Sequence, residues 1–210
     1  MTGVEREVFL TGIGGQGVQL AARILALAAT REGRNVMSLG TYGGTMRGGN
    51  TDSTVVVADG PISSPPVVSR GWSAIVVHSR YWGPLRAKLR PGGVVVFDSQ
   101  FEEAFGRFEE ASAEDRSEGD ARPAIESARM FPVDALSIAR DAEAERAGSL
   151  VLLAAYSAVT GLVSLESLVA AMEQALPPYR REHCAANARA LAAGHGALPA
   201  GAASAWEVAA

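Results

Sequence analysis

Two glycine-rich stretches in the first quarter of the chain contain the residues best suited to bind a ligand. The first, residues 12–17, reads GIGGQG and lies between an apolar run and a stretch with helical periodicity. A turn from a strand into a helix leaves backbone N–H groups unpaired, and the helix dipole adds partial positive charge there. This turn is therefore a natural place for a phosphate or another anion.

The second stretch, residues 41–50, reads TYGGTMRGGN and follows the next predicted strand. Loops that follow the strands of a doubly wound sheet meet at its carboxyl edge, where ligands bind. Arg47 would supply a fixed charge with forked donors for phosphate or carboxylate. The alternative is that Arg47 pairs with Asp52 and only organises the loop. The candidate binding residues of both loops are Gly12, Gly14, Gly15, Gln16, Gly17, Tyr42, Arg47, Gly48 and Gly49.

The first loop also matches the GxGxxG pattern of dinucleotide-binding sites. Those sites need an acidic residue near the end of the second strand, and here the predicted second strand ends SLGT, without a carboxylate. Glu32 precedes that strand and would lie at the wrong end of the sheet. Half of the fingerprint is therefore missing, which disfavours NAD or FAD. A purely structural alternative is that the glycines only allow tight helix–strand packing.

The elements that position these loops alternate between short apolar strands and helices. Strands are predicted at residues 7–11, 35–40, 51–58, 74–78, 94–97 and 128–133, and helices at 18–29, 81–89, 133–145 and within 149–193. This alternation predicts a three-layer α/β/α Rossmann-like sandwich with a C-terminal helical segment. The second and third strands are joined without a helix, so the sheet is expected to be mixed and mostly parallel.

The length of 210 residues suits a single domain, which we assign to residues 1–194. Within it, residues 100–122 hold eight acidic residues against three arginines. We interpret this segment as a solvated acidic excursion, with an acidic docking surface as the alternative. Residues 195–210 are rich in small side chains and are predicted to form a flexible tail.

Composition excludes several classes of function. A net charge of −4 without a dense basic patch argues against nucleic-acid binding. No apolar run is long enough to span a membrane and no signal-peptide pattern is present, so we expect a cytoplasmic protein. The single cysteine, Cys184, excludes an iron–sulfur cluster held by four cysteines of this chain alone. We predict no catalytic residue, no metal ligand and no cofactor held by this chain alone.

The two loops together carry a family resemblance. With the segments STVVVADGPI and LRPGGVVVFDS, they resemble the gamma subunit or gamma domain of 2-oxoacid:ferredoxin oxidoreductases. The similarity is strong over residues 8–99 and resumes at residues 187–191, NARAL, and at Gly194. GGQG followed in the next loop by YGxxxRGG is far more specific than GxGxxG alone.

The resemblance implies a subunit that is not catalytic alone. The holoenzyme would decarboxylate a 2-oxoacid of the 2-oxoglutarate or pyruvate type to an acyl-CoA and reduce ferredoxin. It would use thiamine diphosphate, Mg²⁺, an iron–sulfur cluster and coenzyme A, with alpha and beta subunits as partners and a ferredoxin-like delta subunit as a further candidate. This chain would assist coenzyme A binding and subunit assembly. The alternative is a stand-alone nucleotide-binding or regulatory module of Rossmann-like fold.

Overall fold

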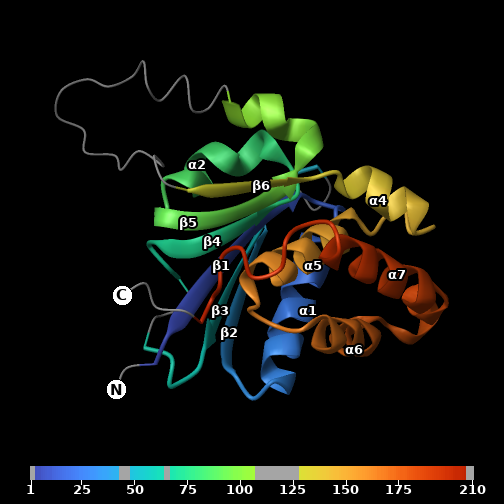
Figure 1. Cartoon of the computed structure of the whole chain (residues 1–210), viewed down its shortest axis with the longest axis horizontal. Coiled ribbons are helices and arrows are strands. Elements are labelled where there is room, and N and C mark those ends of the chain that lie inside the picture. Colours follow the sequence, from blue (N-terminus) through green and yellow to red (C-terminus); the bar gives the residue numbers. More distant parts are fainter. Residues whose placement is uncertain (1–2, 43–47, 64–66, 107–127, 207–210) are drawn as a thin grey trace.

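A computed structural model describes residues 3–42, 48–63, 67–106 and 128–206, built around a six-stranded sheet (Figure 1). The strand order is β2-β3-β1-β4-β5-β6. The strands are β1 (Glu5–Ile13), β2 (Asn35–Tyr42), β3 (Asn50–Ala58), β4 (Gly71–Val76), β5 (Leu89–Asp98) and β6 (Arg129–Val133). β1, β4, β5 and β6 are parallel, and β3 is antiparallel to both β1 and β2. The predicted mixed, mostly parallel sheet is confirmed.

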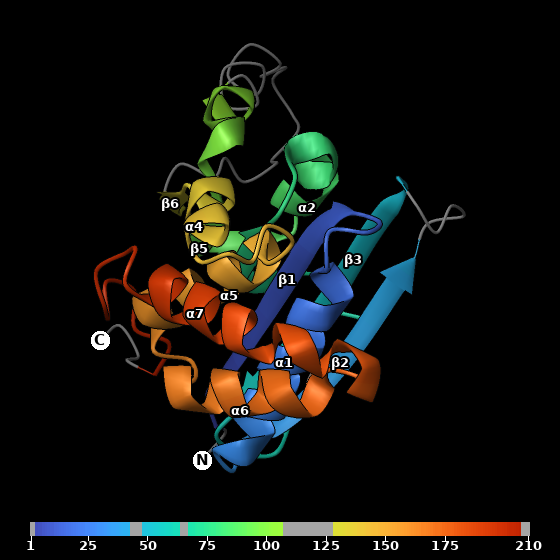
Figure 2. The same cartoon turned by 90° about the vertical axis from the view of Figure 1, so that its right-hand side faces the viewer.

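Helices cover one face of the sheet in two tiers (Figure 2). α1 (Val18–Arg31) and α5 (Gly148–Thr160) contact the strands, while α6 (Leu165–Ala175) and α7 (Cys184–His195) pack outside them. Every α5 residue after Gly148 is buried, as expected for a helix that is apolar on all sides. α7 approaches α5 closely at Gly194, where an added Cβ would collide with the backbone of Val151. This side holds most of the core.

A thinner layer covers the opposite face. There the 3-10 turn η1 (Ser79–Tyr81) leads into α2 (Trp82–Arg86), whose Trp82 packs against Phe105 with ring centroids 5.0 Å apart. Phe105 also stacks on Phe97 of β5 at 4.2 Å. Elsewhere the described chain forms two further turns, η2 (Ser99–Phe101) and η3 (Pro178–His183), and the short helix α4 (Ala135–Asp141). The α/β sandwich predicted from the sequence is confirmed.

The segment from residue 81 to 93 differs from the sequence prediction. The helix expected at residues 81–89 ends at Arg86, and Leu89 already begins β5. The turn expected at residues 91–93 lies within β5, where the pairing with β4 shifts between Gly71 and Ser73. Gly92 adopts φ 72°, a left-handed conformation that lets the strand bulge without breaking.

The C-terminal segment differs as well, because residues 201–206 pack against the protein. Three of its N–H groups donate to the last carbonyls of α5: Gly201 to Ala158, Ala203 to Val159 and Ala205 to Thr160, at 2.7–2.9 Å. Ala203 and Ala205 are buried. The segment thus satisfies carbonyl groups that a helix end leaves unpaired. Residues 207–210, and most of the acidic segment (107–122), lie outside the described residues.

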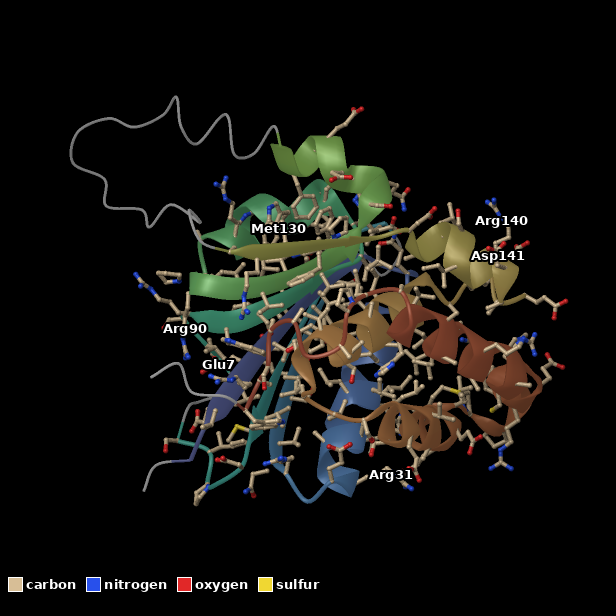
Figure 3. All side chains as sticks on the ribbon, in the orientation of Figure 1. Glu7, Arg31, Arg90, Met130, Arg140 and Asp141 are labelled. Carbon is tan, nitrogen blue, oxygen red and sulfur yellow. The ribbon has the colours of Figure 1, made fainter. Side chains whose placement is uncertain are left out.

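A buried ion pair lies at the amino end of β1. Glu7 is 1% exposed and accepts a hydrogen bond from the half-exposed Arg90 of β5. Figure 3 shows the two side chains together, far from Arg140 and Asp141 of α4. The Arg90 guanidinium hydrogen-bonds one oxygen of the Glu7 carboxylate. The pair therefore links β1 to β5, which are separated by β4.

Candidate functional site

The structure brings the two glycine loops together at one end of the sheet. β3 starts beside the end of β1, with Asn50 opposite Ile13. The Gly14 N–H donates to the Gly49 carbonyl at 2.9 Å, and the Gly48 N–H donates back to the Gly14 carbonyl at 3.4 Å. Antiparallel pairing therefore continues past β1 into the loops. We call this end of the sheet the glycine edge: residues 12–17, 48 and 49.

The first loop is a tight turn closed by its own glutamine. The Gln16 Oε1 accepts from the Ile13 N–H at 2.9 Å, and the Gln16 N–H donates to the Ile13 carbonyl at 3.1 Å. Gly15 and Gly17 have φ values of 103° and 82°, which side chains other than glycine rarely adopt. Gln16 thus shapes the turn, and its Oε1 is already engaged within it.

A polar network supports the glycine edge from β3. The Asp52 carboxylate accepts from the Thr11 hydroxyl at 2.6 Å and from the Asn50 amide at 2.7 Å. The Gln19 amide donates to the Asp52 carbonyl at 2.8 Å and its oxygen accepts from Ser53. β1, α1 and β3 are therefore tied together directly beneath the loops.

The predicted roles of the Arg47 and Tyr42 side chains are not tested by the structure. Arg47 lies outside the described residues, together with residues 43–46 of the second loop. The alternative in which Arg47 pairs with Asp52 stays open for the same reason, although Thr11 and Asn50 already contact both Asp52 oxygens. Tyr42 ends β2 opposite Thr51, so its backbone lies at the same end of the sheet. The predicted roles of these residues remain predictions.

The topology offers a physical reason against a dinucleotide site. In that type of site the second strand lies next to the first and carries the acidic residue for the ribose. Here β3 lies between β1 and β2, and β2 is the edge strand. Glu32, at the end of α1, accepts a hydrogen bond from the Ser164 N–H at 2.7 Å instead.

The carboxyl ends of β4 and β5 carry two further titratable groups, and both are engaged locally. His78 Nδ1 accepts from the Arg80 N–H at 3.1 Å, as a structural histidine would. Burial, followed by the Arg80 charge, lowers the pKa of His78. Asp98 accepts from the backbone and side-chain N–H groups of Gln100, while burial raises the pKa of its carboxyl. Neither group is oriented by a third residue into a nucleophilic site.

A cleft of about 730 Å³ opens on the helix side of the glycine turn. Figure 2 shows the elements around it: the start of α1, the connection from α4 to α5, and α7. The cleft is lined by backbone of the turn and by side chains from these distant segments: Gly15, Gly17, Leu20, Arg140, Glu143, Ala144, Glu145, Arg146, Ala147, Ser149, Leu150, Leu176, Arg180, His183, Ala186 and Asn187. It is the larger of the two best-formed hollows in the part of the chain that the structure describes.

Sequence reasoning identified Gly15 and Gly17 but missed the side chains that face them across this cleft. Arg140, Arg146 and Arg180 are spread over forty positions, and only the packing of α4, α5 and α7 places them near the turn. The sequence held one signal for this region. Residues 146–149, RAGS, directly precede the apolar run of α5, so a helix was expected to begin there, with an arginine beside its first turn and no acidic residue in it.

Within residues 3–42, 48–63, 67–106 and 128–206, no three His, Cys, Asp or Glu side chains are grouped to hold a metal ion. Over the same ranges no helix is long and apolar enough to cross a membrane.

Comparison with known proteins identifies the family. A family profile described as "Pyruvate ferredoxin/flavodoxin oxidoreductase" matches residues 7–197. The chain is 27% identical to the 2-oxoglutarate synthase subunit KorC of Methanocaldococcus jannaschii, over 83% of this chain and 85% of KorC. It is also 27% identical to the pyruvate synthase subunit PorC of Methanothermobacter marburgensis, over 81% of this chain and 86% of PorC.

Among solved structures, the gamma subunit of a keto/oxoacid ferredoxin oxidoreductase from Geobacter sulfurreducens superposes with a TM-score of 0.70 and 25% identity. The match covers 92% of this chain and 95% of that subunit. The expected resemblance is confirmed, and a stand-alone nucleotide-binding module is not favoured. This chain belongs to the pyruvate ferredoxin/flavodoxin oxidoreductase family, as a gamma-type subunit that is not catalytic alone.

Proposed function

We propose that the chain works within a complex that oxidatively decarboxylates a 2-oxoacid of the 2-oxoglutarate or pyruvate type to an acyl-CoA, with reduction of ferredoxin. In this proposal the alpha and beta subunits, with a ferredoxin-like delta subunit as a further candidate, hold thiamine diphosphate, Mg²⁺ and the iron–sulfur cluster. A cluster held by four cysteines would need another subunit, because this chain contains a single cysteine, Cys184. We place the complex in the cytoplasm.

The role of this chain in the proposal is to contact coenzyme A and the partner subunits through the glycine edge. The observation that carries it is the direct pairing of Gly14 with Gly48 and Gly49, which joins the two family-specific loops into one surface. Backbone N–H groups at the start of α1 favour a phosphate there, and Arg47 would add a charged contact. The proposed contacts also include Tyr42, Gly12, Gly15, Gln16 and Gly17.

Co-purification tests the complex. We expect an affinity-tagged chain, expressed in its native host, to retain larger subunits and the brown colour of iron–sulfur clusters. Recovery of a monomer that binds NAD would contradict the proposal.

Arg47→Ala in the assembled enzyme tests the contact with coenzyme A. A hydrogen bond to a charged group contributes about 1.5–3 kcal/mol, so the KM for coenzyme A should rise at least tenfold while the KM for the 2-oxoacid stays constant. Arg31→Ala, at the far end of α1, is the matched control. Unchanged coenzyme A kinetics together with weakened subunit assembly would assign Arg47 to an interface instead.

A further inference from the structure

The two edges of the sheet differ in how they are protected against further strand pairing. β6 is five residues long, begins with Arg129 and contains Pro132. A short length, a charge and a proline are features that keep an edge strand from pairing with another chain. β2 has eight residues, NVMSLGTY, without a charge or a proline, and it pairs with β3 in one continuous register. β2 lacks all these features, and no strand of the described chain pairs with its outer side.

A groove of about 470 Å³ lies beside this unprotected strand, between α1 and β2. α1 contributes the partly buried Leu20, Ala26 and Leu27 to its lining, and β2 contributes Ser38. Figure 2 shows α1 next to β2 at the border of the sheet. When an extended segment of another chain is added to an edge strand, the backbone supplies affinity and adjacent side-chain pockets supply specificity. The edge of β2 and the groove together offer both.

Both faces of β2 offer uncharged contacts to an added strand. Val36 packs against the core and Ser38 lines the groove, so alternate residues of β2 face α1. Met37 and Leu39 lie on the opposite face, and each is 37% exposed. Neighbouring strands place their side chains on the same two faces, where they contact one another. One face of an added strand would therefore meet the leucines of α1, and the other would meet Met37 and Leu39.

The charge of the groove indicates which chain supplies the strand. Arg23 is exposed and is the charged residue of the lining, and it forms no ion pair within the residues that the structure describes. If two copies of β2 paired about a two-fold axis, the same flank of both α1 helices would meet at one seam. Both Arg23 side chains would then lie at that seam, where like charges repel. A different chain with an acidic side chain at this level fits the groove better.

We propose that β2 pairs with an extended segment of a partner subunit, an apolar strand with one acidic side chain that faces Arg23. Its backbone would satisfy the N–H and C=O groups on the outer side of β2, and its side chains would cover Met37 and Leu39. The inference rests on the proposed function for the partner subunits as the source of the strand. The groove shares no residue with the glycine edge, so the two surfaces are tested separately.

Hydrogen–deuterium exchange of the full chain, alone and in the purified complex, tests the added strand. We expect the outward-facing amides of residues 35–42 to exchange at least tenfold more slowly in the complex, because a new backbone hydrogen bond must open first. The amides of β6, the protected edge, are the internal control and should change little. Equal exchange of residues 35–42 in both samples would overturn the inference. Protection of these residues in a dimer of the chain alone would contradict a partner subunit as the source.

Two substitutions test the chemistry of the edge in the assembled complex. Leu39→Lys places a charge beside the added strand and should raise the Kd for the partner subunits at least tenfold. Arg23→Glu turns an attraction into a repulsion and should raise that Kd about fivefold. Arg31→Glu, the same change of charge at the other end of α1 and outside the groove (Figure 3), should stay within twofold of wild type.

Circular dichroism of each free variant checks that the chain is folded, as expected for changes at exposed or half-exposed positions. Equal effects of Arg23→Glu and Arg31→Glu would overturn the acidic partner for Arg23. Co-purification separates this inference from the proposed function. If the tagged chain retains its partner subunits while residues 35–42 gain no protection, the proposed function stands and the strand proposal is wrong. If the chain retains no partner subunits, both are wrong.

Discussion

The charged side chains at the two ends of β1 differ in whether they have partners within the fold. At the amino end, Glu7 is buried against Arg90, and Arg6 lies over the Trp72 ring at 4.8 Å. At the carboxyl end, arginines such as Arg180 surround an open cleft without acidic partners in the described part of the chain. Removing one partner of a buried ion pair lowers the stability of the fold. Unpaired charged side chains around a cleft can instead attract a ligand of opposite charge. The charged residues at the amino end are thus engaged within the fold, whereas the arginines around the cleft have no ion-pair partner among the described residues.

The largest effect is expected from Arg90→Ala. The substitution leaves the Glu7 carboxylate buried without its cation, which costs about 3 kcal/mol, the low end for a broken buried pair because Arg90 is 43% exposed. Urea denaturation at pH 7 measures the loss. The exposed Lys88→Ala is the control, with a change within about 0.5 kcal/mol. A small loss in Arg90→Ala would show that the two ends do not differ.

Gly17 and Ser149 offer the next largest effect, through a double-mutant cycle. Gly17→Ala brings a Cβ to 2.6 Å from Ser149 Oγ and strains a backbone at φ 82°, so it should destabilise the fold by about 1–3 kcal/mol. In the Ser149→Ala background the contact is absent, and the cost should fall by about 1 kcal/mol, leaving the backbone strain. Equal costs in both backgrounds would mean that the hydroxyl does not face the turn.

The smallest effect is a pH dependence at the carboxyl end of β4, where His78 lies. The pKa of His78 is lowered below the ordinary 6.5, so between these values the unfolded chain binds more protons than the folded chain. The stability contributed by the neutral ring is therefore complete above pH 6.5 and is lost as the pH falls through the folded pKa. His78→Asn keeps an acceptor for the Arg80 N–H but does not titrate. Urea midpoints between pH 5 and 7.5 should slope in the wild type more than in the variant, and parallel curves would contradict the assignment.

The sequence predicted those features that depend on a short contiguous stretch of residues. The glycine turn and the strand before it could be predicted from the sequence, because the strand and helix signals there are contiguous. The pairing of Gly14 with Gly49 was anticipated only as a meeting of loops, since the insertion of β3 between β1 and β2 depends on long-range strand pairing. The turn predicted at residues 91–93 was wrong, because these residues lie within β5. Glycine there permits a bulge, while pairing with β4 keeps the strand continuous.

The arginines of the cleft could not be predicted for a different reason. Arg140, Arg146 and Arg180 lie at a helix, a loop and a 3-10 turn, and nothing in their spacing distinguishes them from ordinary exposed cations. Arg140 and Arg146 precede α5 along the chain, whereas Arg180 lies in η3, which leads into α7. Arg180 reaches the other two because α7 packs against α5, with Gly194 close to the Val151 backbone.

The packing of residues 201–206 against α5 has a practical consequence for handling the protein. The Ala205 carbonyl accepts from Arg6, so the two ends of the described chain lie close together at the amino end of β1 (Figure 1). Nine residues of extended strand, about 27 Å, separate that end from the glycine turn. A flexible tether attached at either terminus would therefore anchor the molecule to a solid support with its cleft turned toward the solvent.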